Sequence, residues 1–150
     1  MARHPAEAAA GMIACILLAS GFGRRFGSNK LLYEIDGAPM YQYALELLHT
    51  LSQQTINGQT VQVIVVSQYP RIEQHAQRLG MQAVHNADAA EGIAASVRHG
   101  VRAARRADWL AFFTADQPEL RAETVREFLT QAIQSGKPLA SVASEGQPGN

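Results

Sequence analysis

Residues 13–30 read Ile-Ala-Cys-Ile-Leu-Leu-Ala-Ser-Gly-Phe-Gly-Arg-Arg-Phe-Gly-Ser-Asn-Lys, an apolar run that turns directly into a basic, glycine-rich loop. The run from Ile13 to Ala19 is typical of a strand buried on both faces, with a buried helix as the alternative. The loop after it contains three glycines and three cations: Gly21, Gly23, Gly27, Arg24, Arg25 and Lys30. Glycines let backbone N–H groups approach a ligand closely, so the loop predicts a polyphosphate site; an ordinary turn with solvated arginines is the alternative.

The loop matches neither of the two best-known phosphate-binding glycine motifs. A P-loop requires Gly-Lys-Ser/Thr, whereas two residues separate Gly27 from Lys30 here. A dinucleotide fingerprint requires G-x-G-x-x-G and an acid at the end of the second strand. In this chain three residues separate Gly23 from Gly27, and the next apolar run, 61–67, ends without an acid.

Length and composition place limits on the function. A chain of 150 residues is expected to form one domain, and 13 basic against 13 acidic residues give no general attraction to nucleic acid or anionic membranes. The single cysteine, Cys15, lies inside the first apolar run and is expected to be a core residue. We expect residues 1–11 to be a flexible leader and 12–150 to be the domain. No run approaches the ~18 apolar residues of a membrane span, so a soluble, cytoplasmic protein is expected.

Beyond the loop, strand and helix patterns alternate. The expected elements are an extended piece at 31–35, a helix from Pro39 to about Leu51, a strand at 61–67, a helix from Pro70 to Gly80, a strand at 82–85, a helix from Ile93, a strand at 109–114, a helix at 122–135 and a strand at 137–144. In the helix from Ile93, the inward residues are expected to be Val97, Val101 and Ala104. The alternation predicts an α/β fold, a three-layer α/β/α arrangement with a mostly parallel Rossmann-like sheet.

Three polar residues in or next to these elements are candidates for a functional role. Asp116 follows the strand at 109–114 directly, where open parallel sheets bind ligands, although a loop aspartate can also cap a turn. Ser96 lies in the first turn of its helix, where free N–H groups favour an anion, although it can also simply support the helix start. His75 is interpreted as a packed or surface histidine, because no second metal ligand falls at helical spacing.

The loop also matches the signature L-A-A-G-x-G-x-R-x-G-x-x-K, with Ser20 in place of the second alanine. The matching positions are Leu18, Ala19, Gly21, Gly23, Arg25, Gly27 and Lys30. Asn86, Gly92 and Ser96 reproduce an N-x5-G-x3-S pattern, and Asp116 begins a D-x-P motif. With these motifs the chain resembles the MobA-like nucleotidyltransferase family, whose fold is similar to that of nucleotide-diphospho-sugar transferases, and it is most similar to the molybdenum cofactor cytidylyltransferase branch.

The resemblance implies a role for each motif residue. Main chain at Leu18, Ala19, Ser20, Gly21 and Gly23 would hold the base and the start of a triphosphate. Arg25 and Lys30 would bind the outer phosphates, Asn86 and Ser96 would contact the nucleotide, and Asp116 would hold Mg²⁺. The catalytic set implied in this way is Arg25, Lys30 and Asp116.

The resemblance also implies a reaction and partners. A CMP or GMP unit would move from CTP or GTP to a phosphate-bearing acceptor of the molybdopterin type, with release of pyrophosphate and with a molybdoenzyme as a further partner. CTP is favoured because Asn29 stands where the guanylyl branch has an aspartate, and because residues 91–96 resemble the cytidylyl motif E-G-M-x-x-S.

The family continues beyond this chain's last residue, Asn150, to a second acidic motif, G-D-x-G. We therefore expect a domain incomplete at its C-terminus that binds nucleotide weakly and catalyses poorly. The alternatives are a sugar-phosphate nucleotidyltransferase, a non-catalytic nucleotide-binding module in cofactor delivery, and an NAD-binding domain. A structure with Asp116 on the far side of the molecule from Gly21, Arg25 and Lys30 would contradict the nucleotidyltransferase interpretation.

Overall fold

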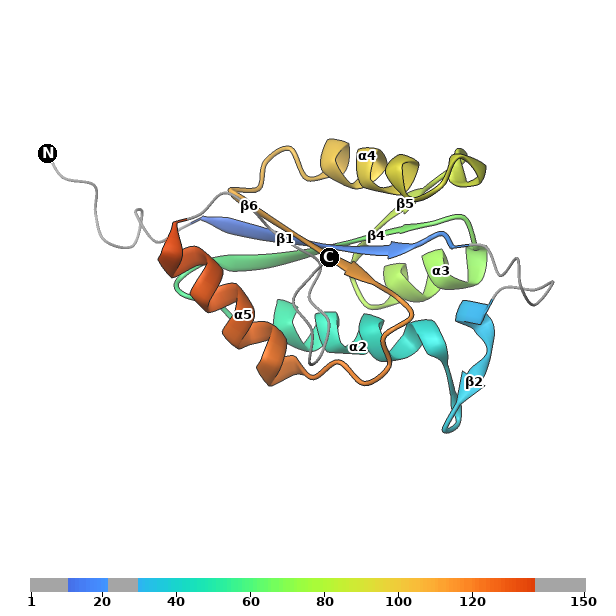
Figure 1. Ribbon diagram of the computed structural model, residues 1–150, viewed down its shortest axis with the longest axis horizontal. Helices are drawn as coiled ribbons and strands as arrows, with labels where there is room; N and C mark the ends of the chain where they lie inside the picture. Colours follow the sequence, from blue (N-terminus) through green and yellow to red (C-terminus); the bar gives the residue numbers. More distant parts are fainter. Residues whose placement is uncertain (1–10, 22–29, 137–150) are drawn as a thin grey trace, which may run out of the picture.

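A computed structural model describes residues 11–21 and 30–136 of the chain, and its centre is a four-stranded parallel sheet (Figure 1). The strands are β1 (Met12–Ala19), β4 (Thr60–Ser67), β5 (Gln82–His85) and β6 (Trp109–Thr114), in the order β5-β4-β1-β6. β1 pairs with β4 on one side and with β6 on the other, so strands that are distant from it in sequence cover both of its edges. The predicted parallel α/β sheet is confirmed.

Helices cover both faces of this sheet. α4 (Ile93–Ala103) lies on one face, while α2 (Met40–Ser52), α3 (Pro70–Arg78) and α5 (Ala122–Ser135) lie on the other, which gives the predicted three layers (Figure 1). The alternation along β1 matches this arrangement. Ile13, Cys15 and Leu17 belong to the core beneath α2, α3 and α5, whereas Ala14, Ile16 and Leu18 belong to the core beneath α4. Burial on both faces is why this run is continuously apolar.

A small hairpin connects the glycine loop to α2. It consists of β2 (Glu34–Ile35) and β3 (Ala38–Pro39), which pair antiparallel across Asp36 and Gly37. Both turn residues have positive φ, 53° and 90°, as a tight hairpin turn requires. The expected extended piece at 31–35 is therefore only partly correct, because Lys30–Leu32 form a short 3-10 helix, η2. Another 3-10 turn, η3 (Ala89–Glu91), precedes α4.

The orientation of α4 differs from the expectation. Val101 is exposed, so its predicted inward position is wrong, whereas Ala104 is buried and Val97 packs against the core as expected. The helix instead turns small residues towards the sheet, above all Gly100. A Cβ at Gly100 would lie 2.6 Å from Ile16 Cγ2, so only glycine allows this close approach. Close packing of small residues overrides the apolar periodicity that placed Val101 inside.

The other boundaries agree closely with the sequence. The strands at 82–85 and 109–114 and the helix at 122–135 are confirmed with the expected limits. The predicted strand at 137–144 lies outside the described residues. Within the part of the chain that the structure describes, no helix combines the length and the apolar character that crossing a membrane would require.

Candidate active site

The carboxyl ends of three neighbouring strands meet at one edge of the sheet. Ala19 at the end of β1 is in register with Ser67 at the end of β4, and Leu18 is in register with Thr114 at the end of β6. The loops that follow these strands therefore leave the sheet side by side. This is the edge at which open parallel sheets hold their ligands.

Lys30 and Asp116 come together at this edge. Lys30 Nζ donates to Asp116 Oδ2 at 3.2 Å, and the side chains are 43% and 38% exposed. Asp116 is fixed there because the N–H of Ala115 bonds to the carbonyl of Leu18 at 3.3 Å. An ion pair this exposed contributes only about 0–1 kcal/mol, so a phosphate or a cation can separate its partners at little cost. The arrangement that would have contradicted the nucleotidyltransferase interpretation is thus not found for Lys30 and Asp116.

The end of β1 and the first residues of the glycine loop are held by side chains at and just after the end of β4. Ser67 Oγ donates to the carbonyl of Ala19 at 2.8 Å, Gln68 Nε2 donates to that of Ser20 at 2.7 Å, and the Tyr69 hydroxyl donates to that of Gly21. Burial raises the pKa of Tyr69, and its hydrogen bond with Gln68 opposes that rise, so the hydroxyl stays a donor at neutral pH.

Sequence reasoning missed Gln68 and Tyr69 as contributors to the site. In the sequence, Ser67-Gln68 indicates only that the strand ends without the acid that a dinucleotide-binding site requires. A signal was nevertheless present, because polar residues directly after an apolar parallel strand lie at the ligand-binding edge. Ser20 is buried, and its hydroxyl donates to the carbonyl of Val66 at 3.3 Å, so it offers its main chain rather than its side chain.

Several expected ligand contacts fall where the structure gives no description. Gly23, Arg24, Arg25 and Gly27 lie outside the described residues, so their predicted roles stay predictions. Leu18 and Ala19 are the last residues of β1, and both are buried. Their backbone, at the end of the strand, is the part of them that lies nearest the loop.

Asn86 and Ser96 are brought together, but as a buried pair. They are 1% and 3% exposed, and Asn86 Nδ2 donates to Ser96 Oγ at 3.0 Å. Asn86 Oδ1 also accepts the N–H of Asp88 at 2.9 Å, and the N–H of Asn86 bonds to the carbonyl of Ser67 at 2.7 Å. In this structure the pair therefore joins β4, the loop after β5 and the start of α4. Their predicted contact with a nucleotide stays a prediction.

A magnesium ion at this edge would have one protein carboxylate. Among residues 11–21 and 30–136, no three His, Cys, Asp or Glu side chains converge as a metal cluster. Mg²⁺ commonly binds through one or two carboxylates together with substrate phosphates and water. The exposed carboxylate of Asp116, next to a candidate phosphate site, fits that donor set.

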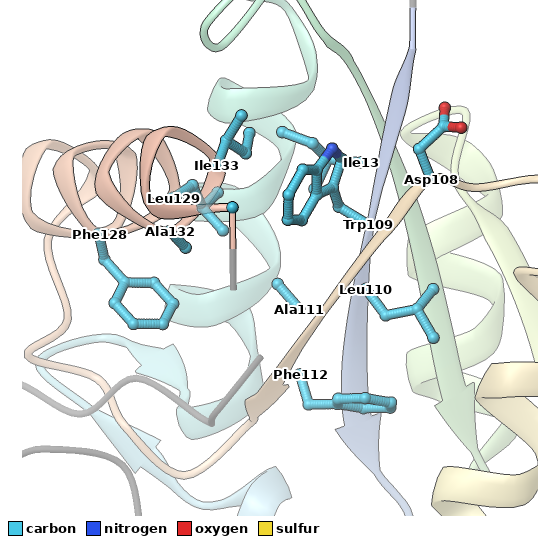
Figure 2. Close-up of a pocket in the computed structure, with 11 residues that line it drawn as sticks. Ile13, Asp108, Trp109, Leu110, Ala111, Phe112, Phe128, Leu129, Ala132 and Ile133 are labelled. Atoms are coloured by element: carbon cyan, nitrogen blue, oxygen red, sulfur yellow. The ribbon is translucent and has the colours of Figure 1, made fainter. Parts of the chain in front are cut away.

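A hollow of about 440 Å³ lies elsewhere, between β6 and α5 (Figure 2). Its walls are largely apolar and include Trp109, Leu129 and Ile133, and none of the predicted site residues that the structure describes lines it. Among the described lining residues Asp108 is the one carboxylate, and Asp108 Oδ2 accepts the N–H of Met12 at 2.9 Å, near the amino ends of the strands. The hollow therefore offers space without the donors that a phosphate needs.

Of two further residues singled out from the sequence, Cys15 lies in the core and His75 is half-buried on α3. Cys15 is fully buried, as expected of a core residue, and burial raises the pKa of its thiol to about 12, so the thiolate nucleophile is absent at neutral pH. His75 Nδ1 lies 2.9 Å from the Tyr41 hydroxyl, and the two rings meet edge to face. This contact joins α2 and α3.

Comparison with known proteins gives a family match. The family described as MobA-like NTP transferase domain matches residues 15–150. A protein of Thermococcus gammatolerans, described as probable molybdenum cofactor guanylyltransferase, is 53% identical over 34 residues, which is 23% of this chain and 18% of the relative. The chain thus matches only a small part of that relative.

Two solved structures share the fold. CMP:2-keto-3-deoxy-manno-octonic acid synthetase complexed with CTP superposes with a TM-score of 0.60 and 22% identity, over 85% of this chain and 49% of the other. Rv0371c from Mycobacterium tuberculosis H37Rv gives the same TM-score and identity, over 85% of this chain and 61% of the other. The chain therefore spans about half to three fifths of these structures.

Proposed function

This chain belongs to the MobA-like NTP transferase domain family, and we propose that it transfers a nucleotidyl unit from a nucleoside triphosphate to a phosphate-bearing acceptor. One observation carries the proposal: Lys30 and Asp116, from motifs 86 residues apart, meet at 3.2 Å beside the start of the glycine loop. A cation and a carboxylate next to main-chain donors are the groups that a triphosphate and its counter-ion require.

The reaction requires the protein to neutralise the negative charge of the phosphates rather than to form a covalent bond with the substrate. An ionised phosphate oxygen of the acceptor attacks the α-phosphorus and forms a new P–O bond. The bond from the α-phosphorus to the bridging oxygen breaks, and pyrophosphate leaves with the electron pair. No general base is needed, because the attacking phosphate is already deprotonated.

Lys30 and Asp116 would have different roles at the triphosphate. The Lys30 ammonium neutralises charge that accumulates on the leaving phosphates, an effect that is large in a preorganised site. When Lys30 turns to a phosphate, the carboxylate of Asp116 is released from the ion pair. Mg²⁺ bound there would supply further positive charge and orient the phosphates. Arg25, by its place in the loop motif, is proposed to assist Lys30.

We propose CTP as the donor and GTP as the alternative. Asn29 and the sequence motif at residues 91–96 favour CTP. The solved synthetase with a similar fold is a complex with CTP. The curated relative, which matches a shorter region, is described as a guanylyltransferase. We propose a molybdopterin-type acceptor, with a sugar phosphate as the competing choice.

Calorimetric titration tests the donor. CTP, GTP, ATP and NAD are each titrated with and without Mg²⁺ into the wild-type chain and into Lys30→Met. We expect a triphosphate to bind more tightly with Mg²⁺, and Lys30→Met to weaken that binding. Binding of NAD in preference to every triphosphate would overturn the proposal. A product assay with molybdopterin and with sugar phosphates then identifies the acceptor.

A further inference from the structure

β1 and β4 remain joined after both strands have ended. Their last paired residues are Ala19 and Ser67. Beyond that pair, side chains replace the backbone hydrogen bonds between the two segments. The side chain of Gln68 donates to the carbonyl of Ser20, and that of Tyr69 donates to the carbonyl of Gly21. With Ser67 on Ala19, three consecutive residues, the last of β4 and the two that follow it, hold three consecutive carbonyls. We call Ser67, Gln68 and Tyr69 the carbonyl clamp.

The members of the carbonyl clamp also hold one another. Gln68 Nε2 donates to the Tyr69 hydroxyl at 3.1 Å, and the N–H of Tyr69 donates to Ser67 Oγ at 3.1 Å. Ser67 is fully buried at the strand end, which anchors the group to the sheet. The three donors therefore act from a fixed framework rather than as independent surface side chains.

The carbonyl clamp determines where the loop's N–H groups point. Within a trans peptide, the carbonyl of one residue and the N–H of the next point in opposite directions. Holding the carbonyls of Ala19 and Ser20 towards the residues after β4 turns the N–H groups of Ser20 and Gly21 away from them. Successive N–H groups that face the same side form a concave receptor for anions.

We propose that the carbonyl clamp is a positioning device that presents the main-chain donors of Ser20 and Gly21 to the phosphates of the bound nucleotide. Tyr69 and Gln68 are thus positioning residues, which act on the ligand through the loop. The inference rests on the proposed function, since it assumes a nucleoside triphosphate at this edge. It assigns Gln68 and Tyr69 a role, although neither residue belongs to any of the three sequence motifs.

The test removes one oxygen atom. Tyr69→Phe deletes the donor to the carbonyl of Gly21 and keeps the ring. We expect the Kd for CTP with Mg²⁺ to rise about 3- to 10-fold, the effect of roughly one hydrogen bond. The increase should become smaller from CTP to CDP to CMP, because the donors serve the phosphate chain, and the melting temperature should stay within about 2 °C of the wild type.

The matched control is Tyr43→Phe. Tyr43 is also a partly buried tyrosine whose hydroxyl donates to a backbone carbonyl, that of Ile35, in the hairpin region. This variant should bind CTP within about twofold of the wild type. Gln68→Leu is a second variant, which removes the donor to Ser20 and should weaken CTP binding by a similar factor.

The outcomes separate the two proposals. If the wild type binds no triphosphate, the proposed function fails. If the wild type binds CTP and both Tyr69→Phe and Gln68→Leu bind it equally well, the carbonyl clamp has no positioning role and the proposed function stands. Equal losses for CTP and CMP, or equal losses in Tyr69→Phe and Tyr43→Phe, would also overturn the positioning role.

Discussion

Two regions beside β6 contrast sharply. At the carboxyl end of the strand, Asp116 meets Lys30, and the neighbouring side chains bond to one another or to loop carbonyls. Along its length, β6 and α5 line the hollow of about 440 Å³, whose described walls are mainly apolar side chains such as Trp109 and Leu129. The first region has two opposite charges in contact, whereas the second has volume and a carboxylate that already accepts a strand N–H.

The candidate site is therefore identified by its converging polar groups and not by the size of a cavity. A triphosphate needs cations and N–H donors, and these occur where parallel strands end. An apolar hollow excludes the charge of such a ligand, because transfer of an unpaired charge to an apolar environment is costly. Substitutions in each region should therefore affect different measurements.

The largest effect is expected from Asp116→Asn. Loss of the carboxylate should lower the rate of nucleotidyl transfer by about 10³-fold, or roughly 4 kcal/mol, because it removes a charge that acts on the reacting phosphates. The rate is measured as pyrophosphate release. Asp108→Asn, which changes the carboxylate beside the hollow and keeps an acceptor for Met12, is the control and should retain the wild-type rate. Equal rates in the wild type and Asp116→Asn would remove the basis of the contrast.

Leu129→Ala should have the next largest effect, and on stability alone. Leu129 lines the hollow and is 4% exposed, so its truncation should lower the free energy of unfolding by about 2–3 kcal/mol. Urea denaturation measures this change. Calorimetry on the folded variant should give a Kd for CTP within about twofold of the wild type, whereas a markedly weaker Kd would connect the hollow to ligand binding.

Gly100→Ala tests the tight contact of α4 with the sheet. The added methyl group would lie 2.6 Å from Ile16 Cγ2, so we expect a loss of about 1–2 kcal/mol in the free energy of unfolding, despite the better helix propensity of alanine. Val101→Ala is the control on the exposed face and should change stability by no more than about 0.5 kcal/mol. A larger loss for Val101→Ala than for Gly100→Ala would contradict the orientation of α4.

The smallest effect should come from titration of His75, which lies away from both regions. Burial, followed by the nearby Arg78, lowers the pKa of His75 below 6.5, while Glu46 opposes this and Arg71 adds to it. The folded state therefore favours neutral His75. The resulting stability is present above pH 6.5 and is lost as the pH falls towards the folded-state pKa. Between about pH 7.5 and pH 5, the free energy of unfolding should fall more in the wild type than in His75→Gln. Parallel pH profiles would contradict this.

Much of the fold could be predicted because local sequence encodes it. The continuous apolar run of β1 indicates burial on both faces, and the stripe around Val125 and Leu129 fixes α5 to its observed limits. Parallel strands place their carboxyl ends together, so the sequence alone predicts Asp116 at the same edge as the glycine loop. The pairing with Lys30 agrees with that rule.

Other features depend on side-chain geometry that no periodicity contains. The bonds from Gln68 and Tyr69 to loop carbonyls require two segments to leave the sheet in the same register, which becomes visible only after pairing. The apolar pattern predicts that Val101 faces the sheet, because such patterns favour large residues. In the structure Gly100 makes the close contact with the sheet. Asn86 and Ser96 form a motif whose spacing is equally compatible with binding a ligand and with bonding to each other.

The position of β1 in the sheet also has a consequence for protein synthesis. Both partners of β1 come later in the chain, β4 from Thr60 and β6 from Trp109, so β1 leaves the ribosome before them and cannot complete its pairing until they have emerged. Non-local parallel pairing of this kind forms slowly. We therefore expect a nascent chain halted before β6 to contain the whole glycine loop and yet lack a formed site, with the edge of β1 open to association with other chains.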